Sequence, residues 1–330
     1  MKKEFFGKTQ DKDIFIYTIN DGDAEVKLIN YGAIISDFKV AGVHSVGGFD
    51  NLDDYVKDKS SQGATVGRVA NRIADATLVI DGAVHMLSAN QYGNCLHGGF
   101  VGFNRKVWET VAEGENSVTF GYFSEDGEEG FPGGVYTKVT FTLSGNALII
   151  DYEAIPDKKT AIALTNHAFF NLNGFGETIN THKAIIYANA ISAVNETKIP
   201  TGEHPLVKGT DFDFTYPREI GEAGIAYDHN YVLEPLEYRE FSGKNLGLAA
   251  TVYGDELMLN VYTDQPGVQF YTGGYLSSGP NFRGDIKPIK HGAFCLEAQI
   301  EPNAVQHGVG IYDVGEVYRQ TTVYEIKKFR

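Results

Sequence analysis

The chain has 330 residues, of which 22% are charged and 42% hydrophobic, a composition typical of a folded globular protein and not of a disordered one. Its formal net charge of −15 disfavours nucleic acids and anionic membrane surfaces as partners, because both are negatively charged. No stretch approaches the roughly 18 apolar residues of a membrane-spanning helix, and the start lacks the apolar core of a secretory signal.

Helical signals are few along the chain. The segment N-L-D-D-Y-V-K-D (51–58) predicts two short turns, capped by Asp50 or Asn51. The acidic stretch E-D-G-E-E-G-F-P-G-G (125–134) is typical of a solvated loop, because it combines turn residues with charge. Neither segment predicts a helix long enough to form a layer of the fold.

Alternation of apolar and polar residues dominates the rest of the chain and predicts strands. In V-Y-T-K-V-T-F-T-L (135–143), Val135, Val139 and Phe141 share one face, and S-G-N-A (144–147) follows as a turn. The segments 249–253 and 257–263 predict a hairpin. Further strands are predicted at 117–123, 147–155 and 321–329.

Strands that recur about every ten residues without intervening helices predict antiparallel sheets packed face to face. No linker, change of composition or internal repeat divides the sequence, so we expect an all-β fold with few short helices and one domain over residues 1–330. The only cysteines, Cys95 and Cys295, exclude a disulfide scaffold and favour a reduced, cytoplasmic setting. Both are interpreted as small buried hydrophobic residues.

Two histidines and one glutamate lie in apolar stretches interrupted by polar groups. His97 lies in N-C-L-H-G-G, His167 in L-T-N-H-A-F-F-N-L and Glu297 in F-C-L-E-A-Q. Carboxylates and imidazoles transfer protons near neutral pH, and apolar neighbours strengthen their effect. The alternatives are a structural histidine in each case and a surface residue at a strand edge for Glu297.

Four further side chains are of the types that bind sugar hydroxyls, since each hydroxyl both donates and accepts a hydrogen bond. They are Asn71, Arg72, Asp228 and Gln269. Taken singly, each is a weak signal, since an arginine such as Arg72 is more often a salt-bridge partner and an aspartate such as Asp228 more often a turn residue.

A metal site and a nucleotide cofactor are both disfavoured. Two histidines and a glutamate match a zinc ligand set, but no H-x-x-x-H or C-x-x-C pair places two ligands together. No glycine-rich phosphate-binding fingerprint is present either. We therefore predict no metal and no cofactor.

The motifs together resemble the galactose mutarotase (aldose 1-epimerase) family nearly end to end. Ten of them occur in the family's order: I-N-Y-G-A (29–33), G-F-D-N-L-D-D-Y (48–55), G-R-V-A-N-R-I (67–73), L-H-G-G (96–99), D-G-E-E-G-F-P-G (126–133), T-N-H-A-F-F-N-L (165–172), I-P-T-G (199–202), D-H-N-Y (228–231), Q-P-G-V-Q-F-Y-T-G (265–273) and C-L-E-A-Q (295–299).

The resemblance implies a large antiparallel β-sandwich, the galactose mutarotase-like supersandwich, with a sugar cleft across one sheet. It implies that Glu297 is the general base, that His167 is the general acid and that His97 assists at the reacting centre. The substrate would be a free aldose such as galactose or glucose, its hydroxyls held by Asn71, Arg72, Asp228 and Gln269, with no metal or cofactor.

The chain departs from the family's pattern at Ala168, Phe169, Ala298 and Glu301, positions that bear on sugar preference and not on the acid or the base. Three other functions remain open: a non-catalytic sugar sensor, a glycoside hydrolase that uses Glu297 and Asp228, and an epimerase of hexose 6-phosphates. The sequence does not define the preferred sugar or the oligomeric state.

Overall fold

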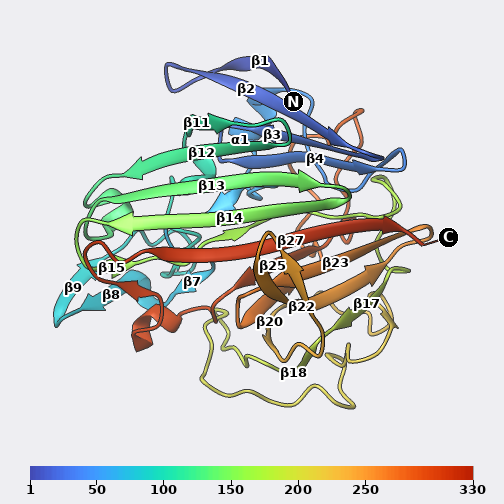
Figure 1. Cartoon of the computed structure of the whole chain (residues 1–330). Coiled ribbons are helices and arrows are strands. Elements are labelled where there is room, and N and C mark those ends of the chain that lie inside the picture. The colour runs from blue at the N-terminus through green and yellow to red at the C-terminus, as the bar shows by residue number, and fades with distance from the viewer. Residues whose placement is uncertain (330) are drawn as a thin grey trace.

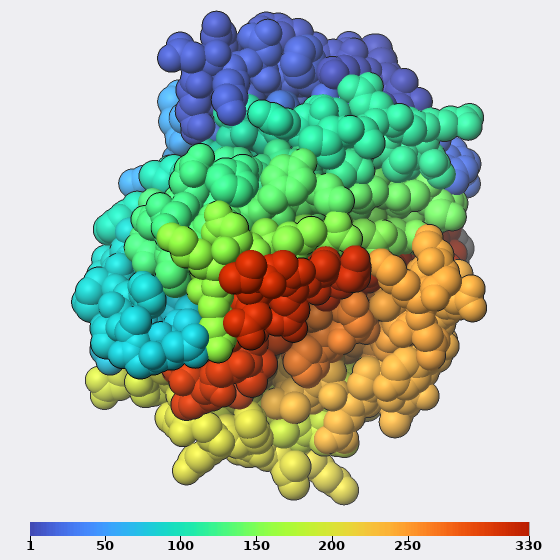
Figure 2. Space-filling view, turned by 60° about the vertical axis from the view of Figure 1, so that its left-hand side comes forward, coloured from blue at the N-terminus to red at the C-terminus, as the bar shows by residue number. Residues whose placement is uncertain are grey.

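The largest layer of the protein is a ten-stranded antiparallel sheet, shown in the computed structural model of Figure 1, in which residues 1–329 are described. Its strands are β11 (Glu109–Glu113), β12 (Ser117–Ser124), β13 (Val135–Ser144), β14 (Ala147–Pro156), β17 (Lys183–Ile186), β19 (Arg218–Glu219), β21 (Tyr238–Phe241), β22 (Lys244–Tyr253), β23 (Leu257–Thr263) and β27 (Tyr318–Lys328). The spatial order is β11-β12-β13-β14-β27-β23-β22-β17-β19, with β21 on β22. The last strand therefore lies in the middle of the sheet, and in Figure 2 C-terminal residues (red) separate green from orange ones.

Two smaller sheets complete the main layers. A five-stranded sheet in chain order contains β1 (Lys2–Thr9), β2 (Lys12–Asp21), β3 (Ala24–Ile29), β4 (Ile34–Val40) and β5 (Val43–His44). A four-stranded sheet contains β18 (Ala188–Ile191), β20 (Asp228–Leu233), β24 (Gly267–Tyr271) and β25 (Cys295–Gln299). Residues from all three sheets form one hydrophobic cluster, including Tyr17, Phe38, Phe120, Phe141 and Phe270. The predicted antiparallel sandwich is confirmed.

Short ladders and turns connect these sheets. Two-residue strands pair as β6 (Thr65–Val66) with β16 (Thr165–Asn166), β7 (Arg72–Ile73) with β10 (Cys95–Leu96), and β15 (Thr160–Ala161) with β26 (Ile311–Tyr312). β8 (Thr77–Ile80) and β9 (Ala83–Met86) form a separate two-stranded hairpin that packs on the core through Leu78 and Ile80. The 3-10 turns occupy Ala74–Ala76, Phe103–Arg105, Glu128–Gly130 and Ala304–His307.

The predicted strands are confirmed, and β13 shows why they form. Val135, Val139 and Phe141 are buried, whereas Lys138 and Thr140 on the other face are half-buried, so the alternation places one face in the core. The predicted turn closes β13 onto β14, with Ser144 paired to Ala147. The predicted hairpin is β22 with β23.

The predicted helix is α1 (Leu52–Lys57), and the Asn51 side chain caps it by accepting a hydrogen bond from the Asp54 amide at 3.0 Å. The prediction of a solvated loop at 125–134 is wrong in part. Glu129 accepts hydrogen bonds from the amides of Phe100 and Val101 at 2.9 and 3.0 Å, and Phe131 is buried. The loop supports the segment that follows His97.

None of the described helices has the length and apolar character needed to cross a membrane. Cys95 and Cys295 are both buried and free, as expected of small hydrophobic side chains.

His182 makes stability depend on pH. Its Nε2 accepts a hydrogen bond from the Leu172 amide at 3.1 Å, and burial lowers its pKa from 6.5 to about 4. The unfolded chain therefore binds a proton first as the pH falls from 6.5 toward 4, and stability is lost in that window. The unfolding free energy of the wild type should decrease when the pH is lowered from 7 to 5. We expect this decrease to be about 2 kcal/mol smaller in His182→Gln. Urea unfolding at both pH values checks this, and an unchanged pH dependence would contradict it.

Candidate active site

One cavity of about 450 Å³ brings together all seven residues that the sequence singled out. Its lining includes Asn71, Arg72, His97, His167, Asp228, Gln269 and Glu297. These residues span more than 220 positions of the chain, so only the packing of separate sheets and ladders places them together. The cavity also extends to two surface segments, at 57–61 and 275–279.

The four-stranded sheet positions Glu297, Gln269 and Asp228. Glu297 in β25 pairs directly with Gln269 in β24, and Asp228 begins β20 opposite Tyr271. Side chains alternate along each strand, so Glu297 faces the cavity while its neighbour Leu296 joins the hydrophobic cluster. Glu297 is only 2% exposed. It is therefore not a surface residue at a strand edge, and Asp228 is not a turn residue.

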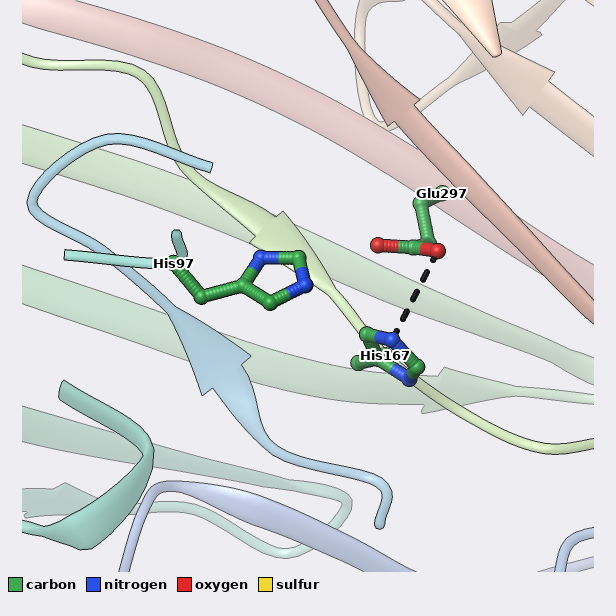
Figure 3. Close-up of side chains that lie close together, drawn as sticks. All are labelled: His97, His167 and Glu297. Atoms are coloured by element: carbon green, nitrogen blue, oxygen red, sulfur yellow. Dashed lines mark ion pairs between the residues drawn. The ribbon is translucent and has the colours of Figure 1, made fainter. Parts of the chain in front are cut away.

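His167 reaches the same cavity from the ladder of β6 and β16. The Thr165 hydroxyl donates to the Ala298 carbonyl at 2.9 Å and ties β16 to β25. Backbone bonds hold His167 itself, since its amide donates to the Ala64 carbonyl at 2.9 Å. The ring Nε2 lies 3.7 Å from Glu297 Oε1, the dashed line in Figure 3.

A second two-stranded ladder, β7 with β10, positions Asn71, Arg72 and His97. The His97 amide donates to the Asn71 carbonyl at 2.9 Å, and the Asn71 amide donates to His97 Nδ1 at 3.1 Å. Both residues adopt a left-handed backbone, with φ of 62° at Asn71 and 52° at His97. Gly98 is also left-handed, and a Cβ there would lie 2.0 Å from the Gly67 carbonyl oxygen. Only glycine therefore fits after His97.

The hydrogen bond from Asn71 defines the tautomer of His97. Because Nδ1 accepts that bond, the neutral ring carries its proton on Nε2 and can donate it. Burial, followed by the charge on the neighbouring His167 ring and that of Arg72, holds the pKa of His97 well below 6.5, so the ring stays neutral. Figure 3 shows His97 and His167 reaching a common space, with ring centroids 5.4 Å apart.

Burial acts in opposite directions on the two members of the Glu297–His167 pair. Burial, followed by the charge of Asp228, raises the pKa of Glu297 well above 4.5. Burial lowers the pKa of His167 to about 4. Charged forms are disfavoured in both cases. The carboxylate of Glu297 is consequently a stronger base, and the imidazolium of His167 a stronger acid, than either would be in water.

The polar groups across the cavity are already oriented. Gln269 Nε2 donates to Asp228 Oδ1 at 2.7 Å, and Arg72 Nη2 lies 3.9 Å from Asp228 Oδ2. Arg72 Nε donates to Gln91 Oε1 at 2.7 Å, and Arg72 Nη1 donates to Asn71 Oδ1 at 3.2 Å. Such a network leaves little conformational entropy to lose when a polyhydroxylated ligand binds.

Gln91 and the segment 57–61 line the cavity but were missed in the sequence. Gln91 lies in a polar, turn-rich stretch, where nothing in the pattern distinguishes it from an exposed loop residue. No signal for it was present without the position of Arg72.

The donor atoms of His97, His167 and Glu297 lie within 4.8 Å of one another, so this group could hold a cation. Zinc bonds of about 2.0–2.1 Å would require neighbouring ligand atoms roughly 3.4 Å apart. The three side chains would have to move inward to bind zinc, and the expectation of a metal-free site stays a prediction.

The fold and the cavity define an all-β protein of the sandwich class with a carboxylate–imidazole site beside groups that suit hydroxyl recognition. A sequence profile described as aldose 1-epimerase matches residues 16–325. The chain therefore belongs to the aldose 1-epimerase family.

Relatives and solved structures agree with this assignment. The chain is 39% identical over 322 residues to the galactose mutarotase of Sus scrofa, covering 93% of this chain and 92% of that one. It is 36% identical over 292 residues to the aldose 1-epimerase of Haemophilus influenzae, covering 84% of each. The structure of a GalM/aldose epimerase homologue from C. elegans matches with a TM-score of 0.87 and 27% identity, over 96% of this chain and 99% of that one.

Proposed function

We propose that the protein is an aldose 1-epimerase that interconverts the α and β anomers of free aldoses such as galactose and glucose. The observation that carries this proposal is the contact between Glu297 and His167, 3.7 Å apart, in a cavity lined by groups that bind hydroxyls. The two proton transfers of ring opening need an acceptor and a donor of these kinds.

In the proposed mechanism, Glu297 removes the proton of the C1 hydroxyl while protonated His167 donates a proton to the ring oxygen. The C1–O5 bond breaks and leaves an aldehyde and a hydroxyl group. Rotation about C1–C2 presents the other face of the aldehyde. The protons then return by the same groups, and the ring closes as the other anomer.

Burial favours these transfers because they neutralise both protein charges. In its reactive form, before ring opening, the pair shares one proton as a carboxylate and an imidazolium, and afterwards it holds a carboxylic acid and a neutral imidazole. The directions of the two pKa shifts favour the second state. The cavity thereby lowers the energy of the open-chain intermediate relative to the closed sugar.

Contacts available in the cavity suit a sugar. The buried Oε2 of Glu297 has no hydrogen-bond partner among residues 1–329 and can accept a hydrogen bond from the C1 hydroxyl of the sugar. That bond would also stabilise the carboxylate over the acid form. Phe169 and Tyr271, with ring centroids 6.0 Å apart, offer apolar faces to the sugar ring.

The test is polarimetry of freshly dissolved α-galactose and α-glucose, with and without the protein. We expect the protein to speed the drift in optical rotation. Parallel arms with a chromogenic glycoside and with α-glucose 6-phosphate separate the alternatives. Release of the chromophore would indicate a glycoside hydrolase, and faster anomer interconversion of the phosphorylated sugar alone would indicate a hexose 6-phosphate epimerase. Tight binding of the sugar with no faster interconversion would indicate a sensor. We also propose a cytoplasmic location, supported by the two free cysteines.

Arg72→Lys is expected to raise KM about tenfold with little change in kcat. Charge-assisted hydrogen bonds to a ligand are worth about 1.5–3 kcal/mol, and lysine keeps the positive charge but loses the planar guanidinium that can donate two parallel hydrogen bonds. Initial rates over a range of sugar concentrations check this. Arg319→Lys, at an exposed site outside the cavity, serves as the control. A fall in kcat at unchanged KM would instead place Arg72 at the reacting atoms.

The pH profile should reflect a pair that shares one proton. With the pKa of His167 lowered to about 4 and that of Glu297 raised, kcat/KM should stay level from neutral pH down to about 5. Below about pH 4 the pair takes a second proton, and Glu297 can no longer act as a base. Polarimetry with circular dichroism at each pH checks both rate and fold. A rise between pH 7 and pH 6 would instead show an acid histidine with an ordinary pKa, which gains its proton in that range.

A further inference from the structure

Cys295 touches the acid histidine on the side away from the carboxylate. Its Sγ lies 3.6 Å from His167 Nδ1, within hydrogen-bond distance for sulfur. Cys295 and Glu297 occupy alternate positions of β25 and so point to the same side of the strand. One strand therefore contacts both nitrogens of the His167 ring, with the carboxylate near Nε2 and the thiol at Nδ1.

Catalysis through Nε2 requires that Nδ1 keep its proton throughout the reaction. The imidazolium carries protons on both nitrogens, and when Nε2 gives up its proton the neutral ring that remains is the Nδ1–H tautomer. The tautomer of a histidine is set by the partner of the other nitrogen. Glu297 lies 3.7 Å from Nε2, too far for a hydrogen bond, so it does not select the tautomer.

Within the described part of the chain, Cys295 Sγ is the side-chain atom at hydrogen-bond distance from Nδ1, and the backbone of His167 itself also bonds to the ring. We propose that Cys295 is a positioning residue that accepts the Nδ1–H bond of His167, which keeps Nε2 facing the substrate and in the tautomer that exchanges its proton. This inference rests on the proposed role of His167 as the acid.

A thiol suits this position better than a stronger acceptor would. Burial, followed by the charge of Glu297, raises the pKa of Cys295 well above 9, so the thiol keeps its proton and stays neutral. A neutral sulfur is a weak acceptor that orients the ring with little stabilisation of the imidazolium. A carboxylate there would raise the pKa of His167 and weaken the acid.

The second cysteine supplies a matched control. Cys95 is also buried and also lies two positions before a cavity residue, His97, but its side chain belongs to a different hydrophobic cluster. Replacing Cys95 removes the same atoms from the core without touching the ring of His167.

The test combines ¹⁵N NMR of histidine-labelled, substrate-free protein with steady-state kinetics. The His167 resonances are assigned by their loss in His167→Gln. At pH 7 we expect a protonated Nδ1 and an unprotonated Nε2 in the wild type and in Cys295→Ser, whose hydroxyl still accepts. Cys295→Ala and Cys295→Val should give resonances averaged between the tautomers.

In kinetics, the Ala and Val variants should lose about tenfold in kcat with KM nearly unchanged, as is typical when a partner that orients a functional histidine is removed. Cys295→Ser should recover most of the loss, and Cys95→Ala should leave the His167 resonances as in the wild type. Unchanged ring resonances in the Ala and Val variants, or a Ser variant as impaired as Ala, would overturn the proposal. Because the tautomer is measured without sugar, a protein with no mutarotase activity would be recognised separately.

Discussion

Replacing Glu297 by glutamine is expected to lower kcat for anomer interconversion by about 10²–10⁴-fold, the range for one positioned acid–base group. The amide keeps the shape of the side chain but cannot accept a proton near neutral pH. The sugar should still bind, because Arg72, Asp228 and Gln269 keep their mutual contacts. The expected result is a fall in kcat with KM within a few-fold of the wild type.

Glutamine at position 297 should not unfold the protein. The carboxyl is buried with a raised pKa, so its removal relieves a desolvation penalty, as replacement of an isolated buried charge does. Polarimetry of both anomers gives the rate, and thermal unfolding gives the stability. Glu301→Gln is the control, since Glu301 pairs with His204 at 2.8 Å and does not line the cavity. Wild-type rates in Glu297→Gln would remove Glu297 as the base.

Much of the fold could be predicted because the strands carry local signals. The alternation in β13 and β14 and the turn between them depend only on residues that are consecutive in the sequence, and the structure confirms both. The central position of β27 carries no such signal, since its partners β14 and β23 lie far away in sequence. Pairing over such distances depends on the whole core.

The chemistry of the site was predictable to a similar extent. His167 and Glu297 stood out because polar groups in apolar stretches cost free energy unless they have a partner or a use. Their mutual distance, the tautomer of His97 and the contact of Cys295 with His167 depend on the packing of the four-stranded sheet against two short ladders. Cys295 in particular was interpreted as a small buried hydrophobe, and its burial is confirmed. Only the coordinates show that its sulfur faces Nδ1.

His167→Gln should reduce kcat by about 10²–10⁴-fold, because the amide can donate a hydrogen bond to the ring oxygen but cannot transfer a proton to it. The double variant with Glu297→Gln should be little slower than the slower single variant. The two groups act in the same step, and losses of residues that act as a unit do not add. Independent, multiplicative losses would mean that the two side chains serve separate steps.

His182→Gln separates a catalytic loss from a general effect of removing a buried imidazole. His182 and His167 are both buried with pKa values lowered to about 4, but His182 lies outside the cavity and binds the Leu172 amide. At pH 7.5, well above the pKa of about 4 that each ring has in the sugar-free protein, His182→Gln should retain wild-type kcat while His167→Gln does not. Equal losses in both variants would mean that burial of the ring, and not its place beside Glu297, accounts for the effect.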